Sequence, residues 1–339
     1  MKNCRYTVIL IGIQLFAILA FRSDSLGVDL DNYDWEYSYL QTFSFKEILL
    51  SLRPFSNAQM LAGAESGFVL LNWLFGFSGL SFHAFLVFHA AVCVSSVCYF
   101  VFKYSRIPWL SLAIVIALGM HNLMFCILRQ SLAVSILYLS IPFIVQRKFL
   151  KFLGMVFLAS QFHVVSWFFL PLFWLSNMTV NYKRVLAIFG ASIFICVANS
   201  FIYNFFFSNV FAVFGKPYEL GSGMTYNNMF VFMSLICIVI FFFYGKEMVF
   251  NKIETTLFWG ALLSVPVQAF GFFIPIFSRA AIGIFLPMSS ILISNMIAKE
   301  KKERVFFFSF MCFLLFFGYY LFVSSSSNLH IIPYRSIFE

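Results

Sequence analysis

A small set of charged residues stands at the edges of long apolar runs, and these side chains are the ones that could do chemistry. Only 10% of the 339 residues are charged, whereas 62% are hydrophobic. Arg22, Arg129 and Arg279 each lie next to the end of an apolar run. A guanidinium offers paired N–H donors that match phosphate oxygens, so together they favour an anion site, with diphosphate as the natural ligand. Each one alone could instead extend from an apolar helix to a polar interface.

Three further residues could act as acids or bases. Asp29 lies in the acidic stretch 27–34, where it could bind a divalent cation, orient an arginine or accept a proton from a sugar hydroxyl. It could equally cap a helix in a solvated turn. Glu65 precedes an apolar run. It could act as a base, or it could be a negative charge that stabilises a helix N-terminus. His163 lies among Phe and Val residues, where it could act as a base or simply pack in the core. We expect no metal and no cofactor, because no histidine is spaced for a zinc site.

The composition predicts the elements that must position these residues. Mean hydropathy is +0.93, the chain has 51 Phe, and its apolar runs are about as long as the 20 residues that a helix needs to cross a bilayer. The runs are continuous rather than alternating, which favours helices. The first run follows Lys2 and Arg5 without a small-residue cleavage site, so it is interpreted as a helix rather than a signal peptide. We expect a single all-α, polytopic membrane bundle over residues 1–339.

Nine full spans are predicted, with one irregular stretch between the fourth and the fifth. The spans are placed at about 6–21, 82–102, 108–127, 131–146, 185–207, 228–245, 256–277, 280–298 and 305–323. Around His163 we expect a re-entrant segment or a hairpin of two short helices. Each arm of such a hairpin would have about 12 residues and would rise only about 18 Å, which is too short to cross the bilayer. Such a hinge is tolerated where it is buried in protein or lines a wet cavity, which makes His163 a candidate site residue.

The charge pattern predicts the orientation of the bundle. With the hairpin in place, most of the 22 Lys and Arg fall in loops on one side, which predicts a cytoplasmic N-terminus and an outward active face in a bacterial inner membrane. The net charge of +9 is then an orientation signal, and we expect no nucleic-acid partner. Two longer outer loops are predicted at about 22–81 and 208–227. The cytoplasmic loops are too short for a nucleotide-binding domain, and no phosphate-binding glycine motif occurs.

The order of the short motifs carries a resemblance to a known family. They run in chain order as Arg22, Gly27, Asp29, Tyr33, Glu65, residues 128–133, Arg147 and Lys148 followed by 159–163, then Arg279, and finally Pro333 and Tyr334. This set resembles the EpsG-like branch of bacterial polysaccharide polymerases, which includes many O-antigen polymerases (Wzy). The resemblance covers most of the chain. It implies transfer of a growing glycan from undecaprenyl diphosphate onto an incoming lipid-linked repeat unit at the outer face of the inner membrane.

The resemblance and the residue types together suggest roles. Arg129 and Arg279 would bind the donor diphosphate, with Arg22 assisting them or paired to Asp29. The base for the acceptor hydroxyl would be His163, Glu65 or Asp29, and Tyr33 could stack on a sugar. The lipid-linked glycan and the bilayer are the expected partners, and the family adds a possible chain-length regulator and flippase.

Three other functions stay open at this level. A lipid-sugar-dependent glycosyltransferase could add one sugar with a metal on Asp29 and Asp31. A flippase or transporter of lipid-linked glycan is another, although no internal repeat is evident. A membrane acyltransferase could use His163.

Overall fold

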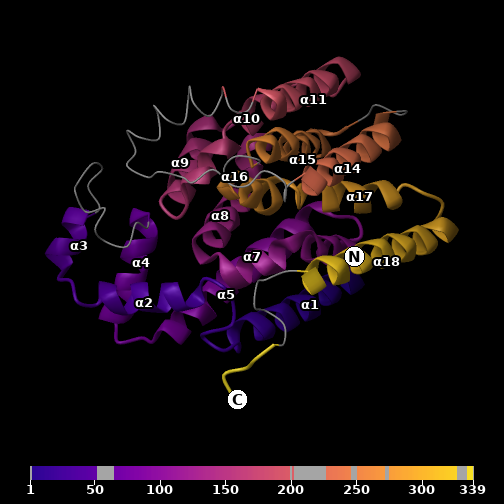
Figure 1. Cartoon of the computed structure of the whole chain (residues 1–339). Coiled ribbons are helices and arrows are strands. Elements are labelled where there is room, and N and C mark those ends of the chain that lie inside the picture. The colour runs from indigo at the N-terminus through magenta and orange to yellow at the C-terminus, as the bar shows by residue number, and fades with distance from the viewer. Residues whose placement is uncertain are drawn as a thin grey trace.

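The computed structural model describes residues 2–51, 65–198, 201, 227–245, 250–271, 275–326 and 334–338. In these ranges the chain is helical, apart from turns and one isolated antiparallel bridge between Arg22 and Ser336. The α-helices are α1 (Lys2–Ala20), α2 (Leu30–Leu40), α3 (Phe45–Ser51), α4 (Ser66–Phe77), α5 (Phe82–Tyr104), α6 (Pro108–Val115), α7 (His121–Cys126), α8 (Leu128–Val145), α9 (Phe149–Ser160), α10 (Pro171–Leu175), α11 (Tyr182–Val197), α14 (Asn227–Gly245), α15 (Lys252–Gly271), α16 (Pro275–Ala280), α17 (Met288–Ile297) and α18 (Lys302–Ser326). Two π-helical turns, η2 (Ile116–Met120) and η5 (Ala281–Phe285), and a 3-10 helix, η3 (Val164–Phe169), complete the set (Figure 1).

Five described helices are long and apolar enough to cross a membrane. They are Phe82–Tyr104, Pro108–Cys126, Leu128–Val145, Ile276–Ile297 and Lys302–Leu321. The predicted spans 6–21 and 228–245 correspond to shorter apolar helices, Tyr6–Ala20 and Met229–Phe242. The predicted span 256–277 corresponds to α15, which is not among the five, and the span 185–207 extends beyond the described part of α11. The second outer loop, 208–227, lies almost entirely outside the described residues.

Two short helices flank His163, as the sequence predicts. The segment α9 packs along α8, and the chain then turns at residues 161–163 and returns through η3 and α10. Ring pairs follow the two arms of this hairpin, because Phe157 lies 6.4 Å from Trp167 near the apex and Phe149 lies 5.1 Å from Phe173 near the base. Arg147 closes the base by donating to the carbonyl of Phe173 over 2.6 Å. His163 therefore lies at the apex of an antiparallel hairpin.

The core of the bundle is apolar and runs through α5, α8, α15 and α17. Phe85, Leu137, Leu262 and Leu292, one from each of these helices, are fully buried. The π-helical turns η2 and η5 face each other next to this core. A π turn frees carbonyl groups from regular pairing, and the hydroxyl of Tyr138 donates to the carbonyl of Gly283 in η5 over 3.0 Å.

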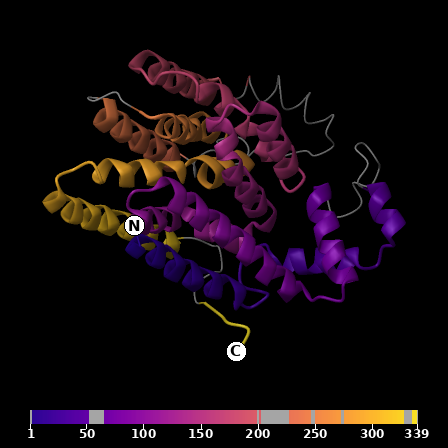
Figure 2. The same cartoon turned by 180° about the vertical axis from the view of Figure 1, so that it is seen from behind.

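The described part of the first predicted outer loop is largely helical. It contains α2, α3 and α4, which lie together at one flank of the bundle in both views (Figures 1 and 2). A small apolar cluster of Leu40, Ile48, Val69 and Trp73 holds the three helices together. The hydroxyl of Tyr37 in α2 donates to the carbonyl of Leu80 over 2.8 Å, so this flank is also tied to the start of α5.

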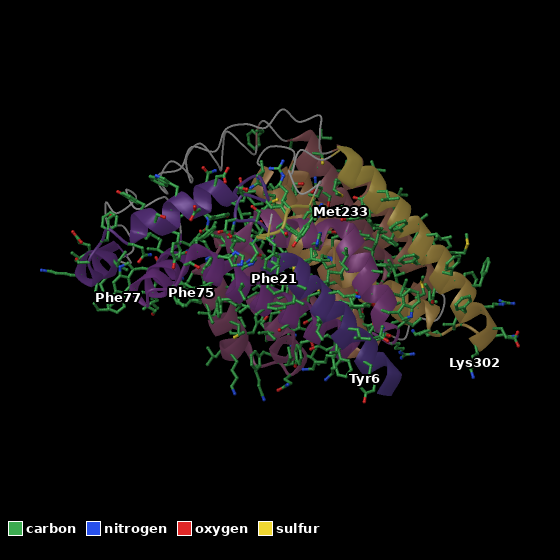
Figure 3. All side chains as sticks on the ribbon, turned by 90° about the horizontal axis from the view of Figure 1, so that it is seen from below. Tyr6, Phe21, Phe75, Phe77, Met233 and Lys302 are labelled. Atoms are coloured by element: carbon green, nitrogen blue, oxygen red, sulfur yellow. The ribbon has the colours of Figure 1, made fainter. Side chains whose placement is uncertain are left out.

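The last described residues return to the end of the first helix. The amide of Ser23 donates to the carbonyl of Arg335 over 2.9 Å, and the amide of Ile337 donates to the carbonyl of Phe21 over 3.0 Å. Figure 3 places Tyr6 of α1 and Lys302 of α18 toward the same side of the molecule. The C-terminal segment consequently pairs with residues 21–23 just after α1, and so covers Arg22.

Candidate functional site

Arg129 lies in the first turn of α8. Helix α7 ends at Cys126, and Ile127 has φ −120° and ψ 72°, so the chain breaks there before α8 begins at Leu128. The Nη1 atom of Arg129 lies 3.4 Å from Oε2 of Glu65, which immediately precedes α4. Their side chains are 26% and 19% exposed, so the pair is partly accessible from outside the protein. The structure thus brings together two candidate residues that are 64 positions apart.

Two aromatic rings hold the guanidinium of Arg129 in place. Its Cζ atom lies 5.6 Å from the ring centroid of Tyr33 and 5.8 Å from that of Phe68. The two rings meet edge to face at 5.6 Å. Burial raises the pKa of the Tyr33 phenol, although the charge of Arg129 opposes this, so Tyr33 stays protonated at neutral pH. Because it is buried, Tyr33 forms a wall for Arg129, and sugar stacking stays a prediction that this placement does not favour.

The start of α4 docks on the apex of the His163 hairpin. The amides of Gly67 and Phe68 both donate to the carbonyl of Gln161, over 2.8 and 3.3 Å. The other carboxylate oxygen of Glu65, Oε1, accepts from the amide of Val164 over 3.3 Å. His163 is buried beside it, and its Nδ1 accepts from the amide of Val165 over 3.4 Å, which caps η3. Glu65 therefore links the hairpin apex to Arg129.

Arg22 is fully buried where α1 ends. Its Nη1 donates to the carbonyls of Met124 and Phe125 over 3.2 and 3.0 Å, and its Cζ lies 5.0 Å from the centroid of the Phe125 ring. The predicted pairing of Arg22 with Asp29 is not found, because the guanidinium turns toward the end of α7 instead. Its Nε and Nη2 have no hydrogen-bond partner among the described residues. Burial lowers the pKa of Arg22 to about 10, so it remains a cation at neutral pH.

Asp29 and Arg279 lie on two other elements, at the start of α2 and in α16. Asp29 occupies the N-cap position of α2 but makes no capping bond through its side chain. The predicted spans 256–277 and 280–298 leave Arg279 in a turn between them, and this is wrong, because α16 already begins at Pro275 and continues through η5 into α17. Arg22 reaches the end of α7, and Arg129 lies in the first turn of α8, so two of the three candidate arginines meet the junction of α7 and α8.

Comparison with known proteins identifies the family of the chain. Residues 5–336 match the EpsG family. The chain belongs to the EpsG family. No curated protein and no solved structure matches the chain. Family membership indicates a function of the polysaccharide polymerase type.

Two contacts of this EpsG-family chain were not predicted. Nδ1 of His83, in the first turn of α5, lies 2.7 Å from Oδ1 of Asp24 in the segment after α1. Fully buried His89 lies 2.6 Å, through its Nε2, from Oγ of Ser131 in α8. No sequence spacing could have identified these pairs, because the partners lie 59 and 42 positions apart and meet only when the helices pack.

Proposed function

We propose that this EpsG-family protein polymerises oligosaccharide repeat units linked to undecaprenyl diphosphate, at the outer face of the bacterial inner membrane. The product would be an O-antigen, capsule or exopolysaccharide. The observation that carries the proposal is the setting of Arg129, a partly exposed cation that Glu65, Tyr33 and Phe68 hold in the first turn of an apolar helix. A cation fixed at the end of an apolar helix suits a substrate with a diphosphate head and a hydrocarbon tail.

The chemistry is a glycosyl transfer with a diphosphate leaving group. The acceptor hydroxyl oxygen attacks the anomeric carbon of the donor glycan, and the bond from that carbon to the phosphate oxygen breaks. The electron pair stays on the lipid diphosphate, and the proton of the hydroxyl passes to a carboxylate or imidazole. Arg129 would stabilise the charge that develops on the leaving diphosphate. The sugar–phosphate bond of the donor supplies the free energy, so the reaction needs no nucleotide sugar.

Among the three candidate bases, Glu65 has the most favourable position. It contacts Arg129 directly and is partly exposed, so an acceptor hydroxyl could reach it beside the leaving group. His163 is buried and its Nδ1 already accepts a backbone amide. Asp29 stands apart from Arg129, at the start of α2. We therefore propose Glu65 as the base, with Arg22 and Arg279 adding positive charge near the diphosphate.

The test is incubation of the purified protein with its lipid-linked repeat unit, followed by separation of the products. Wild type should give a ladder of longer glycans. Arg129→Ala should lower the rate about 100- to 1,000-fold, the cost of removing one preorganised donor. Its level in the membrane should not change, because Glu65 stays partly exposed and keeps its bond from the amide of Val164.

The matched control is Arg184→Ala. Arg184 lies exposed in the first turn of α11, where its guanidinium donates to the carbonyl of Thr179. The ladder of this variant should equal that of wild type. Addition of a single sugar, abolished by a chelator, would instead indicate a metal-dependent glycosyltransferase. Movement of lipid-linked glycan across vesicles without any longer product would indicate a flippase, and a normal ladder from Arg129→Ala would contradict the role of Arg129.

A further inference from the structure

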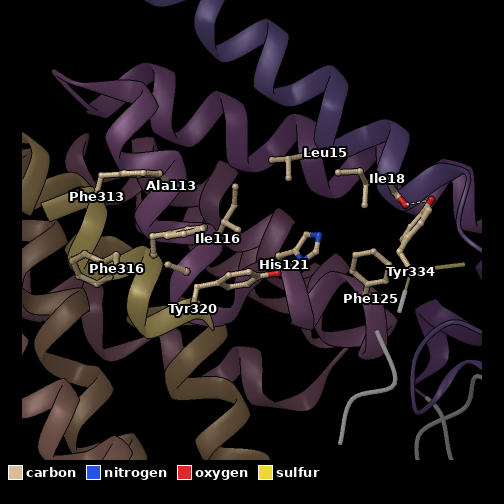
Figure 4. A pocket seen from close by; sticks show the side chains of 12 residues that line it. Leu15, Ile18, Ala113, Ile116, His121, Phe125, Phe313, Phe316, Tyr320 and Tyr334 are labelled. Carbon is tan, nitrogen blue, oxygen red and sulfur yellow. Dashed lines mark hydrogen bonds between the residues drawn. The ribbon is translucent and has the colours of Figure 1, made fainter. Parts of the chain in front are cut away.

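An open apolar groove of about 630 Å³ lies between α1, the α6–α7 segment and α18. Leu15 and Ile18 of α1 form one wall, and Phe316 and Tyr320 of α18 form the other (Figure 4). Ala113 lies on the α6 side of the groove, where a small side chain leaves room. Only 11% of the α18 span is buried, so this helix borders the groove without closing it. The groove therefore has the form that a long hydrocarbon chain requires.

One end of the groove reaches a buried cation. Phe125 lines the groove, and the guanidinium of Arg22 lies over the same ring. Two N–H groups of Arg22, at Nε and Nη2, find no partner in the part of the chain that the structure describes. A buried cation with unused donors is costly unless an anion or other acceptor meets it. This end of the groove is therefore complementary to a negatively charged head group.

His121 connects the apolar walls to this cationic end. In Figure 4 its ring lies in the row of side chains between Tyr320 and Phe125. Its Nδ1 has no hydrogen-bond partner among the described residues. The hydroxyl of Tyr334 donates to the carbonyl of Ile18 over 3.0 Å, so the C-terminal segment borders this end of the groove and covers Arg22. A head group would thus meet His121 first, with the charge of Arg22 directly behind Phe125.

A second apolar groove, of about 550 Å³, lies on the other side of α18, against α14 and α17. It shares Phe316 with the first groove, and Val239 and Leu235 line its α14 side. The charged residue that lines it is Glu300, whose carboxylate would repel an anionic lipid. This groove has similar apolar walls but does not reach Arg22, so it is a suitable control for lipid binding.

We propose that the groove between α1, α7 and α18 binds the polyisoprenyl chain of a lipid diphosphate, with its head group at the end that His121, Phe125 and Tyr334 line, next to the buried charge of Arg22. The assignment rests on the proposed function, which requires such a lipid. It adds two things: the place of the hydrocarbon chain in the fold, and His121 as a residue that positions the head group. The unpartnered Nδ1 atom of His121 can donate to, or accept from, a phosphate oxygen or hydroxyl.

The test is binding of undecaprenyl diphosphate to the full-length protein in nanodiscs, together with a photoreactive analogue that carries its probe in the chain. Ala113→Phe should fill the groove and weaken binding about tenfold, because it displaces roughly two methylene groups from apolar contact. Val239→Phe places the same side chain in the control groove and should bind as wild type does. In wild type, the crosslinks should fall on α1, α6 and Tyr320 rather than on Leu235 or Val239.

The outcomes separate this inference from the proposed function. If wild type binds no undecaprenyl diphosphate, the proposed function fails as well. If Val239→Phe weakens binding and Ala113→Phe does not, or if the crosslinks fall on α14, the lipid binds elsewhere and only the groove assignment is overturned. Equal competition by phosphatidylglycerol would mark an ordinary lipid crevice and also overturn it. The crosslink map of wild type decides the question should Ala113→Phe fail to accumulate.

Discussion

The two carboxylate oxygens of Glu65 contact two different elements. One oxygen faces Arg129 of α8 and the other accepts the amide of Val164 at the hairpin apex. A carboxylate fixed from both sides has a defined orientation, which general base catalysis requires. His163 has a different environment, since its ring is buried and its Nδ1 caps η3. The two residues should therefore respond differently to conservative substitution.

His163→Asn should retain most of the polymerase activity. The Oδ1 of Asn stands at nearly the same distance from the backbone as Nδ1 of His, so it can still accept the amide of Val165. His163→Ala loses this cap and should lower the free energy of unfolding by about 1 kcal/mol. The measurements are thermal unfolding and the rate of ladder formation for each variant.

Glu65→Gln is the contrasting variant, because it keeps the shape of the side chain and removes the base. We expect the rate to fall at least about 100-fold, with a melting temperature near that of wild type. Inactive His163→Asn protein that is fully folded, beside active Glu65→Gln protein, would assign the base to His163 instead.

The sequence identified residues better than it identified their partners. Arg129, Glu65 and His163 were predicted singly, because charge is rare in apolar sequence and each such residue is conspicuous. Their contacts could not be predicted, since Glu65 reaches Arg129 only after α4 docks on the hairpin. The expected pairing of Arg22 with Asp29 failed for a related reason. The carbonyls at the end of α7 lie closer to Arg22, and the sequence carries no signal of them.

At the scale of elements, the position of Glu65 depends on how closely α4 approaches the hairpin. Gly67 makes this approach, because a β-carbon at this position would lie 2.8 Å from both the carbonyl oxygen and the Cβ of Gln161. One of these atoms belongs to the backbone and cannot easily move away. A larger residue would have to push the start of α4, and Glu65 with it, away from the apex.

Gly67→Ala should consequently lower polymerase activity at least tenfold, because a displacement of about 1 Å at a catalytic group has costs of this order or larger. The matched control is Gly154→Ala in α9, where an added β-carbon meets no other described residue within 4 Å beyond its chain neighbours and its own helix backbone. That change should leave the activity intact and raise the stability by about 0.5 to 1 kcal/mol. Full activity in Gly67→Ala would show that the contact with Gln161 does not position Glu65.

Helices marked by a local sequence pattern, such as an apolar run bounded by cations, were predicted more accurately than helices that depend on tertiary packing. The hairpin around His163 follows from the length of the apolar runs and the placement of cations, and the structure has it. The helices of residues 30–51 lack such a signal, because α2 is mixed polar and aromatic and α3 has seven residues. Ser278 and Arg279 interrupt the apolar run, and this interruption predicts a turn at Arg279. The helix in fact begins four residues earlier, at a proline, which is a favoured first helical residue.

At the scale of the whole molecule, charge separates the two ends of the bundle. Arg147, Lys148 and Lys151 lie at the base of the hairpin, whereas Glu65 and His163 lie at its apex. Basic loops mark the cytoplasmic side of helical membrane proteins. The apex, Arg129 and the end of α1 should therefore face outward, which is where the proposed reaction takes place.

Cysteine labelling in intact cells can test this orientation. Ser25 is exposed in the segment that follows Arg22, and Lys148 is exposed at the base of the hairpin. Ser25→Cys should react with a small membrane-impermeant maleimide in intact cells, whereas Lys148→Cys should react only after the cells are lysed. The unsubstituted protein sets the background, which should be low because the free cysteines within the described ranges are buried or half-buried. The reverse pattern would place the site in the cytoplasm and rule out polymerisation at the outer face.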